Sequence, residues 1–181
     1  MEKKKSFLAL GVLILVLVIA YHLYGTLSKQ VSAEQVSQET AQEVQAAPDF
    51  TVYDAAGNAV RLSEQFGKPI VLNFWASWCG PCQMEMPEFE EKYQELGESV
   101  AFMMVNVTDS AGEEAAAKEY VAKQAFTFPV YYDLDLEASG KYGVWSLPTT
   151  YFLDGEGNLI AQASGAINGE TLQQGIDMIM E

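Results

Sequence analysis

The stretch from Ile70 to Cys82 reads Ile-Val-Leu-Asn-Phe-Trp-Ala-Ser-Trp-Cys-Gly-Pro-Cys and holds the only two cysteines of the 181-residue chain. Its first six residues form an apolar run, which predicts a strand buried on both faces of a parallel or mixed sheet. A helix beginning at Cys79 would direct its unpaired amides and positive dipole end at the first sulfur. Such placement lowers a thiol pKa, and the thiolate is the species that attacks disulfides. The pattern therefore predicts a nucleophile, Cys79, and a resolving thiol, Cys82, that close a disulfide within one helical turn.

The sequence gives less support to a zinc site or a purely structural disulfide at this cysteine pair. A structural zinc site needs four ligands, but the chain offers no further cysteine and a single histidine, His22, inside an apolar segment. A purely structural disulfide would close too short a loop to remove much entropy from the unfolded chain. The order of strand, Cys-x-x-Cys and helix therefore favours redox chemistry.

The N-terminus carries a candidate membrane anchor. Residues 7–27 contain no Asp, Glu, Lys or Arg, and about 20 such residues span a bilayer. Three lysines within residues 1–6 predict a cytoplasmic N-terminus, with the rest of the chain on the extracytoplasmic side of the cell membrane. The alternative is a cleaved signal peptide with Val31-Ser32-Ala33 as its cleavage site. We favour the uncleaved, single-pass signal-anchor, because the apolar run is longer than a signal core and the cleavage site lies far from it.

The rest of the chain divides into a linker and one domain. Residues 28–47 are rich in Gln, Ser, Glu and Ala without any aromatic residue, which predicts a flexible linker. Residues 48–181 have the size of one domain with its own core. The formal net charge of −15 belongs entirely to this domain. That charge argues against nucleic acid as a partner and against peripheral binding to anionic lipid.

Hydrophobic periodicity and turn residues predict alternating strands and helices in this domain. The expected strands span 50–53, 59–61, 70–75, 99–107, 128–132, 151–153 and 159–162, and the expected helices span 62–67, 79–96, 113–124, 136–142 and 169–180. Helical crossovers imply parallel strands, and hairpins add antiparallel ones. We therefore predict an α/β fold with a mixed central sheet, helices on both faces and an N-terminal β-hairpin. The core-facing stripe expected of the helix at 79–96 consists of Met84, Phe89, Tyr93 and Leu96.

Four motifs occur together in the domain. They are Asn73 to Cys82, Glu85-Met86-Pro87, the helix at 113–124, and Tyr142-Gly143-Val144 with Leu147-Pro148-Thr149-Thr150. This set resembles the thioredoxin-like proteins, and within them the membrane-anchored TlpA/ResA group, over about residues 47–181. The resemblance implies a thioredoxin-like fold in which the helix at 113–124 is an insertion.

The resemblance also implies which residues bind substrate. Pro148 is expected to form a cis peptide bond with Leu147 beside the two sulfurs, so that the preceding backbone is free to pair with an extended substrate. Without the resemblance we would expect an ordinary trans proline, since only about 5–6% of X–Pro bonds are cis. Trp78, Gly80 and Pro81 are expected to complete the substrate-binding surface.

Glu85 is the third candidate catalytic residue. It lies one helical turn after Cys82, where a partly buried carboxyl group would have a raised pKa and could shuttle the protons of the thiols. On spacing alone it is one more acid in a glutamate-rich helix, but the TlpA/ResA group has a functional glutamate here. Asn73 occupies the place of a buried aspartate in many cytoplasmic thioredoxins, and it cannot accept a proton, which strengthens the case for Glu85.

These features predict an extracytoplasmic thiol–disulfide oxidoreductase that needs no metal and no organic cofactor. The Gly-Pro pair resembles that of reducing thioredoxins, whose potentials are about −270 mV, and favours reduction of protein disulfides. It departs from ResA, which has a charged residue between its cysteines, so a narrow substrate choice is not indicated. By resemblance, apocytochrome c during cytochrome c maturation is a typical substrate, and a membrane thiol carrier of CcdA/DsbD type is the electron donor.

Three alternatives stay open. The protein could be a disulfide oxidase, or a non-catalytic module of the same fold that grips extended cysteine peptides. A metal-carrier role through the cysteine pair is the third.

Overall fold

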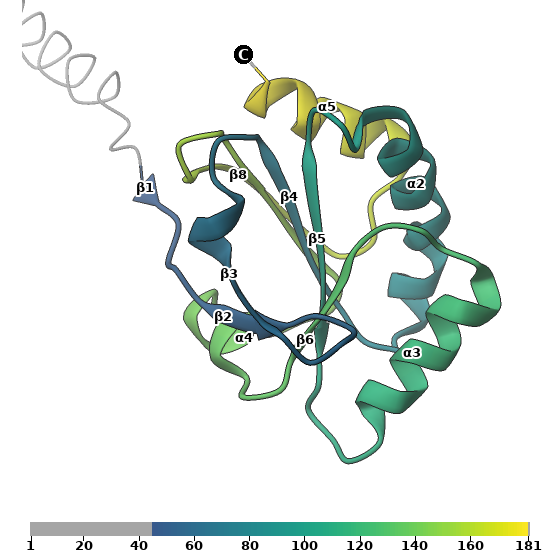
Figure 1. Cartoon of the computed structure of the whole chain (residues 1–181). Coiled ribbons are helices and arrows are strands. Elements are labelled where there is room, and N and C mark those ends of the chain that lie inside the picture. Colours follow the sequence, from purple (N-terminus) through teal and green to yellow (C-terminus); the bar gives the residue numbers. More distant parts are fainter. Residues whose placement is uncertain (1–44, 181) are drawn as a thin grey trace, which may run out of the picture. The chain divides into compact units, whose positions relative to one another are not determined.

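The computed structural model describes residues 45–180. The strands of this domain form one eight-stranded sheet in the order β1-β8-β7-β4-β5-β6-β2-β3. The central strand β4 (Ile70–Trp75) pairs in parallel with β5 (Ala101–Val107) and antiparallel with β7 (Thr149–Leu153). Beyond β5, the strand β6 (Val130–Asp133) continues the parallel part of the sheet. The sheet is mixed, as predicted, and β4 lies in its middle (Figure 1).

Antiparallel pairs form both edges of the sheet. β2 (Thr51–Tyr53) and β3 (Ala59–Arg61) make the predicted N-terminal hairpin, which joins the sheet through β6. At the opposite edge β8 (Asn158–Ser164) pairs with β7, and the two-residue strand β1 (Gln45–Ala46) pairs with β8. The sheet therefore takes in Gln45 and Ala46, which the sequence pattern placed at the end of the linker.

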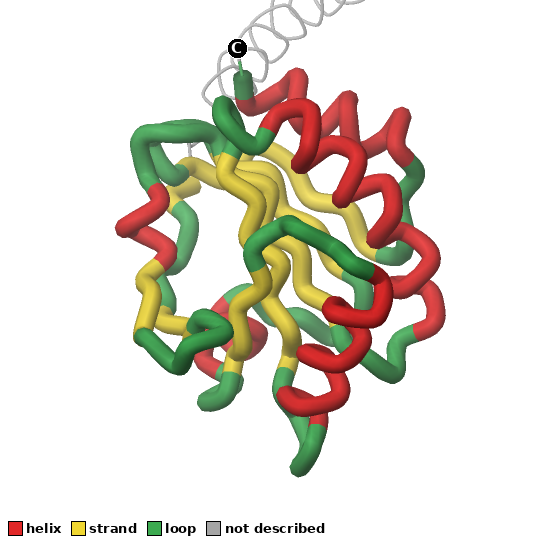
Figure 2. Tube along the Cα trace, turned by 45° about the vertical axis from the view of Figure 1, so that its right-hand side comes forward, coloured by secondary structure: helices red, strands yellow, loops and turns green. Residues whose placement is uncertain are grey.

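One face of the sheet is covered by three helices (Figures 1 and 2). They are α2 (Gly80–Leu96), α3 (Glu113–Gln124) and α5 (Gly169–Ile179). Val71 and Trp75 of β4 join side chains of these helices in one buried cluster. Since a protein interior is close-packed, this cluster holds the helices at fixed positions on the sheet.

The opposite face carries shorter elements. Ile70, Leu72 and Phe74 of β4 pack in a second buried cluster with the 3₁₀ turn η1 (Leu62–Gln65) and the helix α4 (Glu137–Lys141). β4 is thus buried on both faces along its whole length, which explains why its sequence is almost uniformly apolar. The prediction of helices on both faces is confirmed.

The predicted inward stripe of α2 is wrong at one position. Met84 is 71% exposed, whereas Cys82, Glu85, Met86 and Phe89 are buried. These buried positions are spaced by three or four residues, so Met84 points away from them. The buried stripe includes the carboxylate of Glu85, which a search for apolar residues at helical spacing does not detect.

Within residues 45–180, no helix is both long and apolar enough to cross a membrane. The predicted cytoplasmic N-terminus (1–6), the anchor (7–27) and residues 28–44 of the predicted linker lie outside the described residues.

Close contact between α5 and β7 depends on Gly175. A Cβ atom at this position would overlap the ring of Phe152, which is itself 2% exposed in the core. Gly175→Ala should therefore lower the free energy of unfolding by roughly 1–3 kcal/mol through overpacking, as measured by urea denaturation. The control is Gly140→Ala in α4, where nothing lies within 4 Å of the added atom, so stability should be unchanged or slightly raised. Equal stability of the two variants would contradict this explanation.

Candidate active site

Cys79 and Cys82 form a disulfide at the beginning of α2, with their Cα atoms 5.3 Å apart. Cys79 is the N-cap residue of the helix, and the backbone N–H of Cys82 donates to its Sγ at 3.2 Å. Pro81 occupies the first turn, where a missing amide costs nothing. The helix therefore presents its positive end to the first sulfur, as the sequence predicted.

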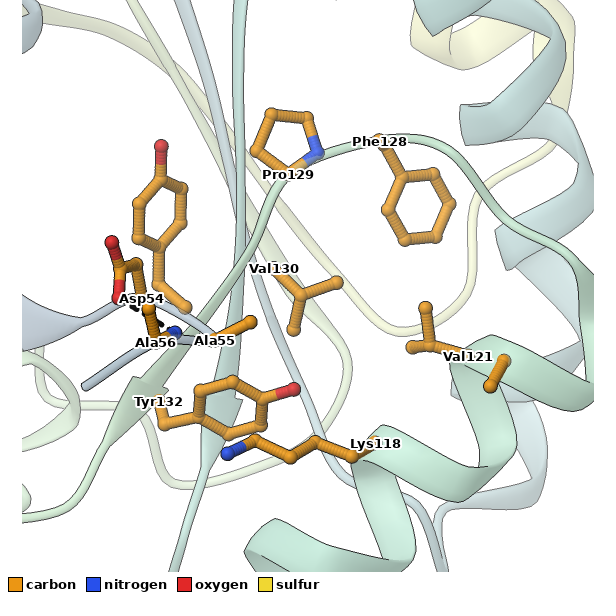
Figure 3. Close-up of a pocket in the computed structure, with 11 residues that line it drawn as sticks. Asp54, Ala55, Ala56, Lys118, Val121, Phe128, Pro129, Val130 and Tyr132 are labelled. Atoms are coloured by element: carbon orange, nitrogen blue, oxygen red, sulfur yellow. Dashed lines mark hydrogen bonds between the residues drawn. The ribbon is translucent and has the colours of Figure 1, made fainter. Parts of the chain in front are cut away.

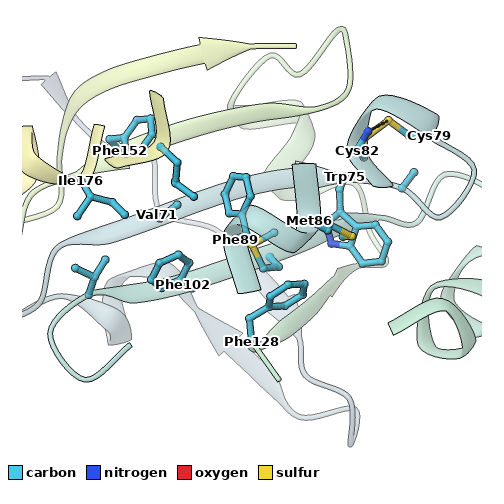
Figure 4. Packing of buried hydrophobic residues seen from close by; sticks show 14 of the residues in the cluster. Val71, Trp75, Cys79, Cys82, Met86, Phe89, Phe102, Phe128, Phe152 and Ile176 are labelled. Carbon is cyan, nitrogen blue, oxygen red and sulfur yellow. Dashed lines mark hydrogen bonds between the residues drawn. A yellow bond between two sulfur atoms is a disulfide. The ribbon is translucent and has the colours of Figure 1, made fainter. Parts of the chain in front are cut away.

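The two cysteines differ in access. Cys82 is fully buried, whereas Cys79 is 5% exposed. Figure 4 shows the disulfide at one end of the buried cluster that contains Trp75 and Met86. Of the two residues, only Cys79 retains any accessible surface, which favours Cys79 as the attacking position and Cys82 as the resolving one.

A cis peptide bond joins Leu147 and Pro148, which confirms the expectation from the resemblance. Thr149, the next residue, pairs with Phe74 near the end of β4 that leads to Cys79. The register therefore brings the cis proline to the same end of the sheet as the cysteines. Pro148 is buried, and Leu147 is partly buried against both core clusters.

The surface around this end of the sheet is rich in exposed aromatic side chains. Trp78 is 59% exposed and Trp145, in the loop before the cis proline, is 96% exposed. Gly80 and Pro81 are exposed beside Trp78. Trp145 also borders a hollow of about 310 Å³ with Val107.

Glu85 is buried one turn along α2 and is 2% exposed. Its Oε1 accepts a hydrogen bond from Asn73 Nδ2, and its Oε2 accepts one from the backbone N–H of Ile167, both at 2.9 Å. Burial raises the pKa of Glu85 to about 7, although the two hydrogen bonds act in the opposite direction. The raised pKa is the one expected from the sequence, and an acid of this strength exchanges its proton readily at neutral pH. The catalytic role of Glu85 stays a prediction.

Asn73 holds Glu85 in place from the middle of β4. Its Nδ2 also donates to Thr150 Oγ1 at 3.0 Å, while its Oδ1 is buried without a partner among the residues that the structure describes. The sequence pattern identified Asn73 only as a departure from thioredoxins and gave no hint of its contact with Glu85. Ile167 was missed altogether, because a backbone N–H donated from a loop 82 residues away leaves no sequence signal.

Sequence reasoning also missed Glu113, at the first turn of α3. Its side chain is 4% exposed and accepts hydrogen bonds from Ser77 and Asn106. Ser77 precedes Cys79 by two residues, so α3 is joined to the loop that leads to Cys79. The only available signal was an acidic residue at a helix N-terminus, which is common in proteins.

A separate hollow of about 530 Å³ lies between the tip of the β2–β3 hairpin and α3 (Figure 3). Asp54, Lys118, Val121, Phe128 and Tyr132 are among its lining residues. It contains none of the predicted site residues. In the part of the chain that the structure describes, no three His, Cys, Asp or Glu side chains are grouped so as to hold a metal ion.

Comparison with known proteins places this site in a family. The profile of the AhpC/TSA family matches residues 44–162. The chain is 34% identical over 176 residues to the thioredoxin-like protein YneN of Bacillus subtilis, covering 96% of this chain and 98% of that protein. It is 34% identical over 173 residues to the thiol-disulfide oxidoreductase ResA of Bacillus thuringiensis, covering 94% and 95%.

Solved structures agree with these sequence relatives. The exposed lipoprotein thioredoxin of Streptococcus pneumoniae superposes with a TM-score of 0.62 at 32% identity, covering 70% of this chain and 96% of that one. The fold and the cysteine pair define a thioredoxin-like disulfide oxidoreductase. The chain belongs to the AhpC/TSA thioredoxin-like family, and it is a thiol–disulfide oxidoreductase of the ResA type.

The raised pKa of Glu85 makes stability depend on pH. The folded protein holds the Glu85 proton up to about pH 7, whereas the unfolded chain releases it near its usual pKa of 4.5. Stability should therefore fall as pH rises through this window. In the oxidised protein, Glu85→Gln leaves one of the two N–H donors to this side chain without its acceptor, which lowers stability by the same amount at every pH. Relative to wild type, the variant should nevertheless gain roughly 2–3 kcal/mol between pH 4.5 and pH 8, as measured by urea denaturation.

The matched control for this measurement is Glu91→Gln, an exposed acid on the same helix. Its stability should follow the wild-type pH dependence throughout. If Glu85→Gln shows that same dependence, the raised pKa is refuted.

Proposed function

We propose that the protein reduces protein disulfides on the extracytoplasmic side of the cell membrane, to which residues 7–27 anchor it. One observation carries this proposal. The more accessible cysteine caps α2, while a buried carboxyl group with a pKa of about 7 lies one turn further along the same helix. This arrangement supplies a nucleophile and a proton acceptor without a cofactor.

In the reduced protein the Cys79 thiolate attacks a substrate disulfide. One substrate sulfur forms a mixed disulfide with Cys79, and the other leaves as a thiolate that takes up a proton. The helix N-terminus stabilises the negative charge on Cys79 before the attack. The exposed rings of Trp78 and Trp145 provide an apolar surface for the substrate around Cys79.

Cys82 then completes the transfer of two electrons. Glu85 takes the proton of the Cys82 thiol, and the resulting thiolate attacks the sulfur of Cys79. The bond between Cys79 and the second substrate sulfur breaks, that sulfur leaves as a thiolate and takes up a proton, and the pair Cys79–Cys82 becomes a disulfide. A backbone edge next to the cis peptide bond of Pro148 would hold the substrate chain in an extended form.

The substrate and the donor follow from the resemblance to the TlpA/ResA group. Apocytochrome c, which carries a cysteine pair that must be reduced, is the proposed substrate. A membrane thiol carrier of CcdA/DsbD type is the proposed source of electrons. The pneumococcal relative is named an exposed lipoprotein, which supports an extracytoplasmic site, although this chain has no cysteine before Cys79 to carry a lipid.

The redox potential of the Cys79–Cys82 pair tests the direction of electron flow. Because Gly80 and Pro81 resemble the pair in reducing thioredoxins, we expect a potential close to about −270 mV, measured by equilibration with dithiothreitol buffers. Pro81→His is the control, because strong oxidases often have histidine between their cysteines, and its potential should be less negative. A wild-type potential above about −150 mV would make the protein an oxidase.

Trapping tests the substrate and the location together. In intact cells, full-length Cys82→Ser should accumulate mixed disulfides through Cys79, and mass spectrometry of the captured proteins should find apocytochrome c. A membrane-impermeant maleimide, added to intact cells before the Cys82→Ser variant has formed mixed disulfides, should abolish capture, because the proposal places Cys79 on the extracytoplasmic side of the membrane. Cys79→Ser should capture nothing. Capture that persists after the maleimide would refute the extracytoplasmic location.

A further inference from the structure

A buried carboxylate connects the inserted helix α3 to the loop that precedes Cys79. Oε1 of Glu113 accepts hydrogen bonds from the backbone N–H of Ser77 at 2.6 Å and from Asn106 Nδ2 at 2.8 Å. Its Oε2 accepts one from Ser77 Oγ at 2.7 Å. Hydrogen bonds to a charged acceptor are stronger than neutral ones, and burial makes them expensive to break.

Ser77 is held from both sides of its backbone. Glu113 binds its N–H, and Gln83 Nε2 in the first turn of α2 donates to its carbonyl oxygen. Two residues later, the backbone N–H of Cys79 donates to the carbonyl of Ala76 at 3.2 Å. The chain between the end of β4 and the sulfur of Cys79 therefore has little freedom to move.

The other residues of the network are themselves fixed. Asn106 is fully buried near the end of β5, and its Oδ1 accepts a hydrogen bond from Thr108 Oγ1 at 3.1 Å. Further along α3, the ring of Tyr120 lies 6.1 Å from that of Trp75 at the end of β4. Glu113 thus belongs to a helix that is attached to the active-site strand at a second point.

We propose that Glu113 is a positioning residue, whose hydrogen bonds to Ser77 hold Cys79 where α2 activates its sulfur. Glu113 acts on the cysteine through Ser77, to which both of its carboxylate oxygens are hydrogen-bonded. The inserted helix is then part of the catalytic apparatus, because it supplies the group that fixes the loop. This role rests on thiol–disulfide exchange at Cys79 and is independent of the substrate, location and electron flow proposed above.

Two substitutions separate positioning from a simple effect of charge. Glu113→Gln keeps the length and one oxygen that can accept from Ser77 N–H and Asn106, and its amide can donate to Ser77 Oγ. Glu113→Asp keeps the charge but is one methylene shorter, so it cannot reach all three donors. Positioning predicts that the Gln variant keeps the wild-type reactivity and that the Asp variant loses it. A charge effect predicts that the Asp variant keeps the wild-type profile and that the neutral Gln variant moves the profile to lower pH.

The experiment measures the reactivity of Cys79 in the reduced full-length protein in detergent. The rate of alkylation by iodoacetamide is followed from pH 5 to 9, and the rate of reaction with oxidised glutathione is measured at pH 7. For Glu113→Asp and Glu113→Ala we expect both rates to fall roughly tenfold, and the alkylation profile to move to higher pH. For Glu113→Gln we expect both rates to stay within about twofold of the wild-type rates.

The matched control is Glu114→Ala, which removes the neighbouring acid of the same helix turn and its exposed ion pair with Lys118. It should leave both rates and the profile unchanged. Circular dichroism and thermal unfolding report whether each variant is folded. If Glu113→Ala does not fold, the comparison of the Asp and Gln variants decides the question.

Three results would overturn the proposal. A Gln variant as slow as the Asp variant would mean that hydrogen-bond geometry is not what matters. An Asp variant with wild-type rates would assign the effect to charge. A Gln variant whose alkylation profile moves to lower pH would do the same. Unchanged rates and profiles in all variants, with only the unfolding temperature lowered, would leave Glu113 a purely structural residue.

Discussion

The constraint on which the rest depends is the turn from β4 into α2. The chain leaves a strand that is buried on both faces and must reach a helix N-terminus within the four residues from Ala76 to Cys79. Because β4 cannot shift without disturbing both core clusters, the end of the strand is a fixed platform. The first sulfur is thereby placed where unpaired amides and the helix dipole act on it.

Two buried glutamates flank this turn and have different surroundings. Glu85 lies one helical turn beyond the cysteines with few hydrogen bonds, and its burial raises its pKa to about 7. Glu113 lies beside the loop and accepts three hydrogen bonds from Ser77 and Asn106. Burial with few partners suits a group that exchanges protons, whereas a full set of donors suits one that fixes a backbone. The two environments therefore fit the proton exchange proposed for Glu85 and the positioning proposed for Glu113.

Local patterns predicted much of the fold correctly. The strand at 70–75 and the helix at 113–124 have the predicted bounds, because an uninterrupted apolar run and a run of good helix formers are strong local signals. The inward stripe of α2 was wrong at Met84, because the helix buries Cys82 and Glu85 on the core side and thus rotates the apolar pattern. For the site, the cysteine pair followed from its spacing at the start of a helix, whereas Glu85 and the cis proline needed the family resemblance.

By itself, the sequence determined the cysteine pair and the helix that begins at it, since these depend on residues within one turn of each other. Only the tertiary structure decided how the acids are used. Asn73 and Ile167 reach Glu85 across 12 and 82 residues of chain, and Ser77 reaches Glu113 across 36. Such contacts arise because the sheet and the helices pack together, and no local pattern records which distant donor a buried carboxylate will meet.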